Sequence, residues 1–83
     1  MGKTVIEKEL KKIWWMDGRS LENTSIEIIE RRGSTQTTKI IELNKGTIVM
    51  KDRLVIGDKV IPFHRIITII HRGKVVWRRR GYA

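Results

Sequence analysis

The chain contains no cysteine. This absence excludes a disulfide-stabilised scaffold, an iron–sulfur cluster, a thiolate zinc site and a catalytic cysteine. No apolar run approaches the roughly 18 residues that a membrane-spanning helix needs. The first residues, MGKTVIEKELKK, are charged where a signal peptide would be apolar. We therefore expect a cytoplasmic protein without a membrane partner.

The motifs of several large enzyme classes are also missing. The sequence has no phosphate-binding P-loop, no G-x-G-x-x-G, no G-x-S-x-G and no metalloprotease helix. Two histidines without a third ligand at suitable spacing make a poor metal site. We expect neither a metal nor a cofactor. A length of 83 residues leaves room for a single domain, residues 1–83.

Acidic residues are absent from the C-terminal part of the chain. Asp58 is the last acid, whereas seven of the 18 Lys and Arg residues follow it. Residues 1–58 are close to neutral at +2, and the last 25 residues carry +7 of the net +9. A one-sided basic surface favours a polyanion, nucleic acid before an acidic membrane or protein. The alternative is a basic protein that needs no partner beyond counterions.

Residues 4–15 are predicted to form an amphipathic helix that ends at Asp17-Gly18. Its apolar residues recur at i, i+4, i+7 and i+8, which places them in one stripe. Trp15 falls outside this stripe, so we expect its side chain to be exposed. The stripe consists of Ile6, Leu10, Ile13 and Trp14.

Beyond residue 24 the apolar period changes to two, which is typical of strands. Turn signals such as Gly57-Asp58 separate the segments, and they are too short for parallel crossovers. Whether Asp52-Arg53 is a turn or a bulge stays open. The fold class is therefore α+β: an N-terminal helix packed on a mostly antiparallel sheet of about six short strands, which could curl toward a barrel. The predicted strands span residues 25–32, 35–43, 47–51, 53–56, 59–61, 63–71 and 75–79.

His64 and Arg65 stand near the start of the most apolar predicted strand, residues 63–71. A regular strand would place them on opposite faces, at the rim of the core. A half-desolvated position there strengthens contact with an anion. The alternative is that Arg65 lays its stem over the core and His64 bonds a backbone carbonyl. His64 and His71 would lie about 23 Å apart on opposite faces, which disfavours a two-histidine ribonuclease.

Other basic groups flank this segment. Arg31-Arg32-Gly33 ends the first predicted strand. Trp77 and Arg79 project to the same side of the last strand, where they could stack a base or form a cation–π pair, although a Trp in a small domain is more often part of the core. We expect an auxiliary basic patch that comprises Arg31, Arg72, Lys74, Arg78 and Arg80.

The string IPFHRIITIIHRGKVVWRRRG resembles the RNA cyclic group end recognition domain family of small archaeal proteins. Family members have an N-terminal helix that ends in Trp, a mid-chain Arg-Gly, the pattern I-P-x-H-R-I, and a Gly before V-x-W-x-R. Arg78 departs from the family pattern, in which an acid is common, and makes this surface unusually basic. The matching residues are Leu10 to Trp14 or Trp15, Arg32-Gly33, Ile61-Pro62, His64-Arg65-Ile66, Gly73, Val75, Trp77 and Arg79.

The resemblance implies a non-catalytic RNA-binding module for RNA termini that carry a 2′,3′-cyclic phosphate. The implied partners are RNA and an RNA repair or processing enzyme. Two alternatives stay open: a general basic nucleic-acid-binding or ribosome-associated protein, and a cyclic phosphodiesterase. The implied RNA- and phosphate-binding residues are Arg32, His64, Arg65, Trp77 and Arg79.

Overall fold

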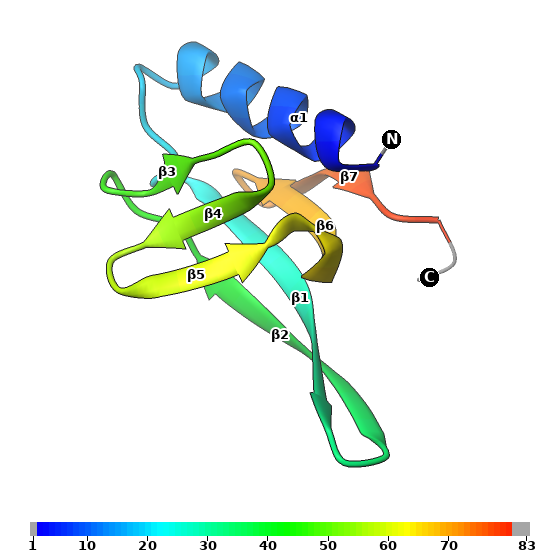
Figure 1. Ribbon diagram of the computed structural model, residues 1–83. Helices are drawn as coiled ribbons and strands as arrows, with labels where there is room; N and C mark the ends of the chain where they lie inside the picture. Colours follow the sequence, from blue (N-terminus) through cyan, green and yellow to red (C-terminus); the bar gives the residue numbers. More distant parts are fainter. Residues whose placement is uncertain (1, 81–83) are drawn as a thin grey trace.

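The computed structural model describes residues 2–80, with side chains from residue 5 onward. Within these residues one helix precedes two antiparallel sheets, which confirms the α+β class (Figure 1). The strand orders are β2-β1-β6-β7 and β3-β4-β5, and neither sheet closes into a barrel. The elements are α1 (Gly2–Met16), β1 (Thr24–Arg32), β2 (Thr35–Glu42), β3 (Ile48–Val49), β4 (Arg53–Ile56), β5 (Lys59–Pro62), the 3₁₀ helix η1 (Phe63–Arg65), β6 (Ile66–His71) and β7 (Lys74–Arg78).

Helix α1 packs its apolar stripe into a core that both sheets share. Trp14 is half-buried against this core, whereas Trp15 is 63% exposed. This confirms the prediction that Trp14 belongs to the apolar stripe and that Trp15 lies outside it. No described helix has both the length and the apolarity to cross a membrane. The buried core consists of Ile6, Leu10, Ile13, Leu21, Ile26, Ile28, Leu43, Leu54, Ile61, Phe63, Ile66 and Ile69.

The predicted strand at residues 63–71 was wrong in its first three residues, which form η1. Pro62, at φ −64° and ψ 143°, ends the edge strand β5 and precedes this turn. The Phe63 amide donates to the carbonyl of Asp52 (2.9 Å), and the Phe63 ring is completely buried. Burial of this ring turns the chain inward, so strand pairing resumes only at Ile66.

The turns follow their local sequence. Gly57-Asp58 closes a hairpin in which Ile56 pairs with Lys59, and Gly57 adopts φ +62°, as the glycine-first turn predicts. The predicted strand 47–51 is reduced to Ile48–Val49 because turns take up both of its ends. The Thr47 amide donates to the carbonyl of Asn44, and the Met50 amide donates to that of Arg53. The chain therefore turns, rather than bulges, between β3 and β4.

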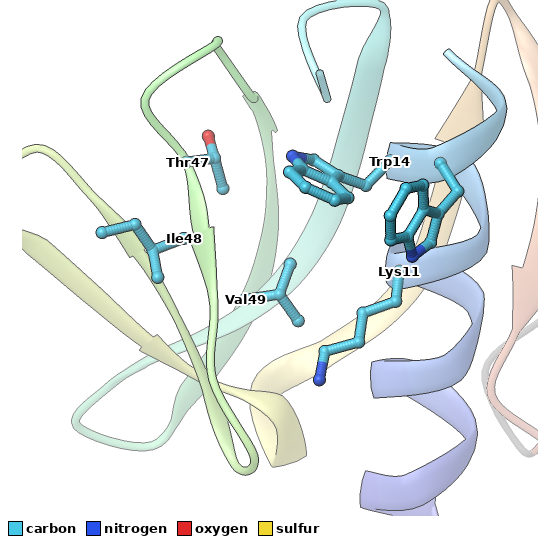
Figure 2. Close-up of a pocket in the computed structure, with 6 residues that line it drawn as sticks. Lys11, Trp14, Thr47, Ile48 and Val49 are labelled. Atoms are coloured by element: carbon cyan, nitrogen blue, oxygen red, sulfur yellow. The ribbon is translucent and has the colours of Figure 1, made fainter. Parts of the chain in front are cut away.

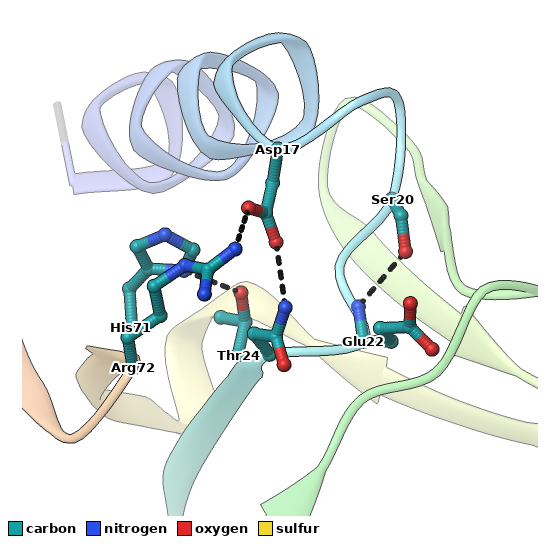
Figure 3. Close-up of polar contacts among 7 residues, drawn as sticks. Asp17, Ser20, Glu22, Thr24, His71 and Arg72 are labelled. Atoms are coloured by element: carbon teal, nitrogen blue, oxygen red, sulfur yellow. Dashed lines mark hydrogen bonds and ion pairs between the residues drawn. The ribbon is translucent and has the colours of Figure 1, made fainter.

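A polar cluster joins the loop after α1 to the β6–β7 turn (Figure 3). Arg72 donates from Nη2 to Oδ1 of Asp17 (2.6 Å), and Asn23 donates from Nδ2 to Oδ2 (3.2 Å). Thr24 Oγ1 lies 3.2 Å from Nδ1 of His71 in the same region. The hydrogen bonds from Arg72 and then Asn23 lower the pKa of the Asp17 carboxyl below its ordinary value.

Asp17→Asn is expected to lower the free energy of unfolding at pH 7. A lowered folded-state pKa means that the carboxylate stabilises the fold above its unfolded pKa and loses that effect as the pH falls through the folded value. The difference in the free energy of unfolding between the variant and the natural chain should therefore shrink in acid. Urea unfolding at pH 7 and at about pH 3 measures it. Glu22→Gln, which removes a neighbouring exposed carboxylate, is the control; a difference that stays constant with pH would contradict the assignment.

Candidate nucleic-acid interface

A hollow of about 340 Å³ lies where η1 meets β1. Its lining residues are Ile29, Arg31, His64 and Arg65. The three polar side chains are exposed and Ile29 is half-buried, so cationic groups stand beside an apolar wall. Such a wall reduces the local dielectric constant and strengthens hydrogen bonds from a guanidinium to an anion. This hollow has the donors that a phosphate group needs.

The 3₁₀ geometry of η1 places His64 and Arg65 in the same hollow. A regular strand would have directed the two neighbouring side chains to opposite faces. In a turn of three residues, by contrast, Phe63 enters the core while both of its successors remain at the surface. The predicted position at the rim of the core is thus retained, but the predicted alternation of His64 and Arg65 is wrong.

Arg79, which directly follows β7, holds this turn. Its Nε and Nη2 donate to the carbonyl of Ile66 (3.1 and 2.9 Å), and Nη2 also donates to that of Phe63 (3.0 Å). The Arg79 guanidinium carbon lies 5.5 Å from the Trp77 ring centroid, and Trp77 is half-buried against the core. Neither residue lines the hollow. The Arg79 hydrogen bonds fix the backbone that carries His64 and Arg65.

The basic pair at the end of β1 divides between the two faces of the strand. Arg31 shares a face with Ile29 and lines the hollow. Arg32, which pairs with Thr35 beside the turn, is exposed and does not line it. The family resemblance implies Arg32 as a binding residue and Arg31 is expected only in the auxiliary patch, whereas in the structure Arg31 lines the hollow. The sequence shows that Arg31 and Ile29 lie on the same face of β1, because they are two residues apart. It does not show which face of β1 lies beside η1.

The remaining basic residues lie in different places. Arg72, in the β6–β7 turn, is paired with Asp17, and Lys74 is exposed beside the same turn. This turn lies at the end of β6 that is away from η1. Arg78 and Arg80 are exposed on either side of Arg79. His71, which contacts Thr24, also lies at the far end of β6 from His64.

A second hollow, of about 390 Å³, lies between α1 and β3 (Figure 2). It is the larger of the two, but its walls are mainly apolar. Its lysine ammonium, on Lys11, is 3.0 Å from the Glu7 carboxylate. The smaller hollow therefore has more cationic side chains to bind an anion. The second hollow is lined by Lys11, Trp14, Trp15, Thr47, Ile48 and Val49.

Among residues 2–80 no three His, Asp or Glu side chains gather closely enough to hold a metal ion.

Comparison with known proteins finds a family match over almost the whole chain. Residues 4–79 match the family described as the MJ1316 RNA cyclic group end recognition domain. A UPF0248 protein of Thermococcus sibiricus is 37% identical over 82 residues, 98% of this chain and 92% of the relative. UPF0248 proteins of Pyrococcus horikoshii and Metallosphaera sedula are 34% and 35% identical, over 96% and 89% of this chain and 95% and 91% of their own lengths. No solved structure matches the chain.

Arg79→Ala is expected to destabilise the protein by about 1–3 kcal/mol, because it leaves the carbonyls of Phe63 and Ile66 without their side-chain donor. Arg78→Ala, which removes the exposed neighbouring guanidinium, is the matched control and should change stability by less than about 0.5 kcal/mol. Urea unfolding measures both values. Amide hydrogen exchange at Ile66 should quicken in the Arg79 variant alone. Equal effects of the two substitutions would show that Arg79 does not hold the turn.

Proposed function

Because this chain belongs to the MJ1316 RNA cyclic group end recognition domain family, we propose that it is a non-catalytic RNA-binding module that recognises RNA termini carrying a 2′,3′-cyclic phosphate. One observation supports this proposal above the others. His64 and Arg65 are exposed together in one hollow, and Arg31 joins them from β1. The hollow thus combines two guanidinium groups and an imidazole at a site large enough for a nucleotide end.

The chemistry of a cyclic phosphate suits these donors. The group is a diester with one negative charge and two free oxygens. Arg65 can contact both oxygens through its planar fork, while His64 donates a hydrogen bond to the phosphate or the ribose. Ile29 offers an apolar surface to the ribose ring. A 3′-hydroxyl end has no terminal phosphate, so the fork of Arg65 would have no partner there.

A linear terminal phosphate carries more charge than the cyclic diester, about −1.5 to −2 at neutral pH. Coulombic attraction alone would therefore favour the linear end. A preference for the cyclic end must come from the shape of the hollow, in which the half-buried Ile29 lies beside the charged groups. A comparison of cyclic, linear phosphate and hydroxyl ends separates shape recognition from charge attraction.

The positions of the histidines favour binding over hydrolysis. Opening a cyclic phosphate by acid–base catalysis needs two proton-transfer groups within reach of the phosphate. Only His64 of the two histidines lines the hollow, and His71 contacts Thr24 at the far end of β6. We propose that the module acts in RNA repair or processing, where a separate enzyme would carry out the chemistry on the end that it holds.

Binding assays with matched oligonucleotides test end recognition. Cyclic-phosphate RNA should bind more tightly than the same RNA with a 3′-hydroxyl, and Arg65→Ala should weaken binding of the cyclic end by about 1.5–3 kcal/mol, roughly 10- to 150-fold. Arg80→Ala, at an exposed base outside the hollow, should weaken binding of both RNAs equally. The salt dependence should have a log–log slope of about −0.7 per contacted phosphate. Equal affinities for the two ends would favour a general nucleic-acid-binding protein.

Incubation of a cyclic-phosphate oligonucleotide with the protein should leave the end intact. The expected result, read on a denaturing gel after hours at micromolar protein, is no ring opening by the natural chain or by His64→Ala. Ring opening that the His64 substitution abolishes would replace the binding module with a cyclic phosphodiesterase.

A further inference from the structure

The β1–β2 hairpin continues beyond the sheet that it helps to build. Strand β1 pairs with β6 only from Thr24 to Ile28, but its pairing with β2 continues to Arg32. Within residues 2–80, the pairs from Ile29–Thr38 to Arg32–Thr35 therefore have no third strand beside them. Figure 1 shows this end of the hairpin projecting from the body of the molecule. We call residues 29–38 the arm.

The composition of the arm suits a polar partner better than a protein core. Every residue from 31 to 40 is exposed, and a two-stranded hairpin without packing is only marginally stable in water. Arg31 and Arg32 supply charge, and Glu30 is the single acid of the arm. Its second strand offers a row of short hydrogen-bonding side chains, Thr35, Gln36, Thr37 and Thr38.

The two faces of the arm differ in their relation to the hollow. Cross-strand partners project to the same side, so Ile29 and Thr38 share a face with the pair Arg31 and Gln36. We call this the hollow-side face because Ile29 and Arg31 also line the hollow. It carries a cation and no acid. The reverse face carries both charges, Glu30 and Arg32, together with Thr35 and Thr37.

We propose that the hollow-side face of the arm holds the nucleotides directly upstream of the RNA terminus that binds in the hollow. This inference rests on the proposed function and adds a direction to it: the terminal nucleotide lies at Arg65, and the chain runs along the arm toward Gly33. Arg31 belongs to both the hollow and the arm, and at this junction it contacts the first internal phosphate. Gln36 and Thr38 donate hydrogen bonds to riboses or bases.

The length of the arm sets the number of nucleotides. Four residues of a strand span about 13 Å, which matches about four nucleotides stacked at about 3.4 Å each. Affinity should therefore rise with RNA length over the first four or five nucleotides and then level off. Charge alone would give a continued increase as more phosphates reach the basic surface.

The test is a length series of RNAs from one to eight nucleotides, each made with a cyclic-phosphate end and with a 3′-hydroxyl end, titrated into the natural chain and two double variants. Gln36→Ala with Thr38→Ala alters the hollow-side face, and Thr35→Ala with Thr37→Ala alters the reverse face as the matched control. The hollow-side variant should lose about tenfold in affinity for the longer RNAs through the loss of two neutral hydrogen bonds. Its affinity for the single nucleotide should be unchanged, and the control should differ from the natural chain by less than about twofold.

The outcomes separate the two proposals. A natural chain whose affinity does not rise beyond one nucleotide, or equal losses in the two variants, would overturn the role of the arm while leaving end recognition in place. A hollow-side loss that is the same for cyclic and 3′-hydroxyl RNAs, with no preference between the ends, would support the arm as an RNA contact and overturn end recognition. Equal melting temperatures of the two variants would show that the comparison reports binding rather than folding.

Discussion

The contact on which the candidate site depends is made by one guanidinium and two backbone carbonyls. Arg79 reaches back over 13 and 16 residues to Ile66 and Phe63 and holds the end of η1. Pro62 fixes the entrance to the same turn, and the buried ring of Phe63 fixes its orientation. Because Phe63 takes the buried side of the turn, His64 and Arg65 remain exposed at the surface. A cation outside the hollow thus determines how the residues inside it are presented.

Some cationic side chains of the protein stabilise the fold, whereas others remain exposed where a ligand could bind them. Arg72 is paired with Asp17, and Arg79 is engaged with carbonyls. Arg31 and Arg65, in contrast, are exposed at the hollow beside His64. The net charge of +9 by itself points to a polyanion. The positions of these few groups decide where on the molecule an anion would find several donors together.

The size of a hollow is a poor guide to its chemistry in this small domain. The larger one, between α1 and β3, arises where two elements with few mutual contacts leave Trp14 partly uncovered. The smaller one gathers side chains from β1 and η1, which lie far apart in the sequence. The family match over residues 4–79 includes the arm, the turn and Arg79, so the region proposed to contact RNA lies entirely within the shared domain.

The features that depend on near neighbours could be predicted from the sequence. The stripe of α1, the exposure of Trp15 and the glycine-first turn at Gly57 follow from spacing and backbone conformation within a few residues. Two further features could be read only from the folded chain: Phe63–Arg65 forms a turn, and Arg31 rather than Arg32 lines the hollow. Both outcomes depend on how strands distant in sequence align, including the bulge that leaves Ile67 between the pairs Glu27–Thr68 and Ile28–Ile66. Such an alignment is fixed by burial across the whole core and is not encoded in a local pattern.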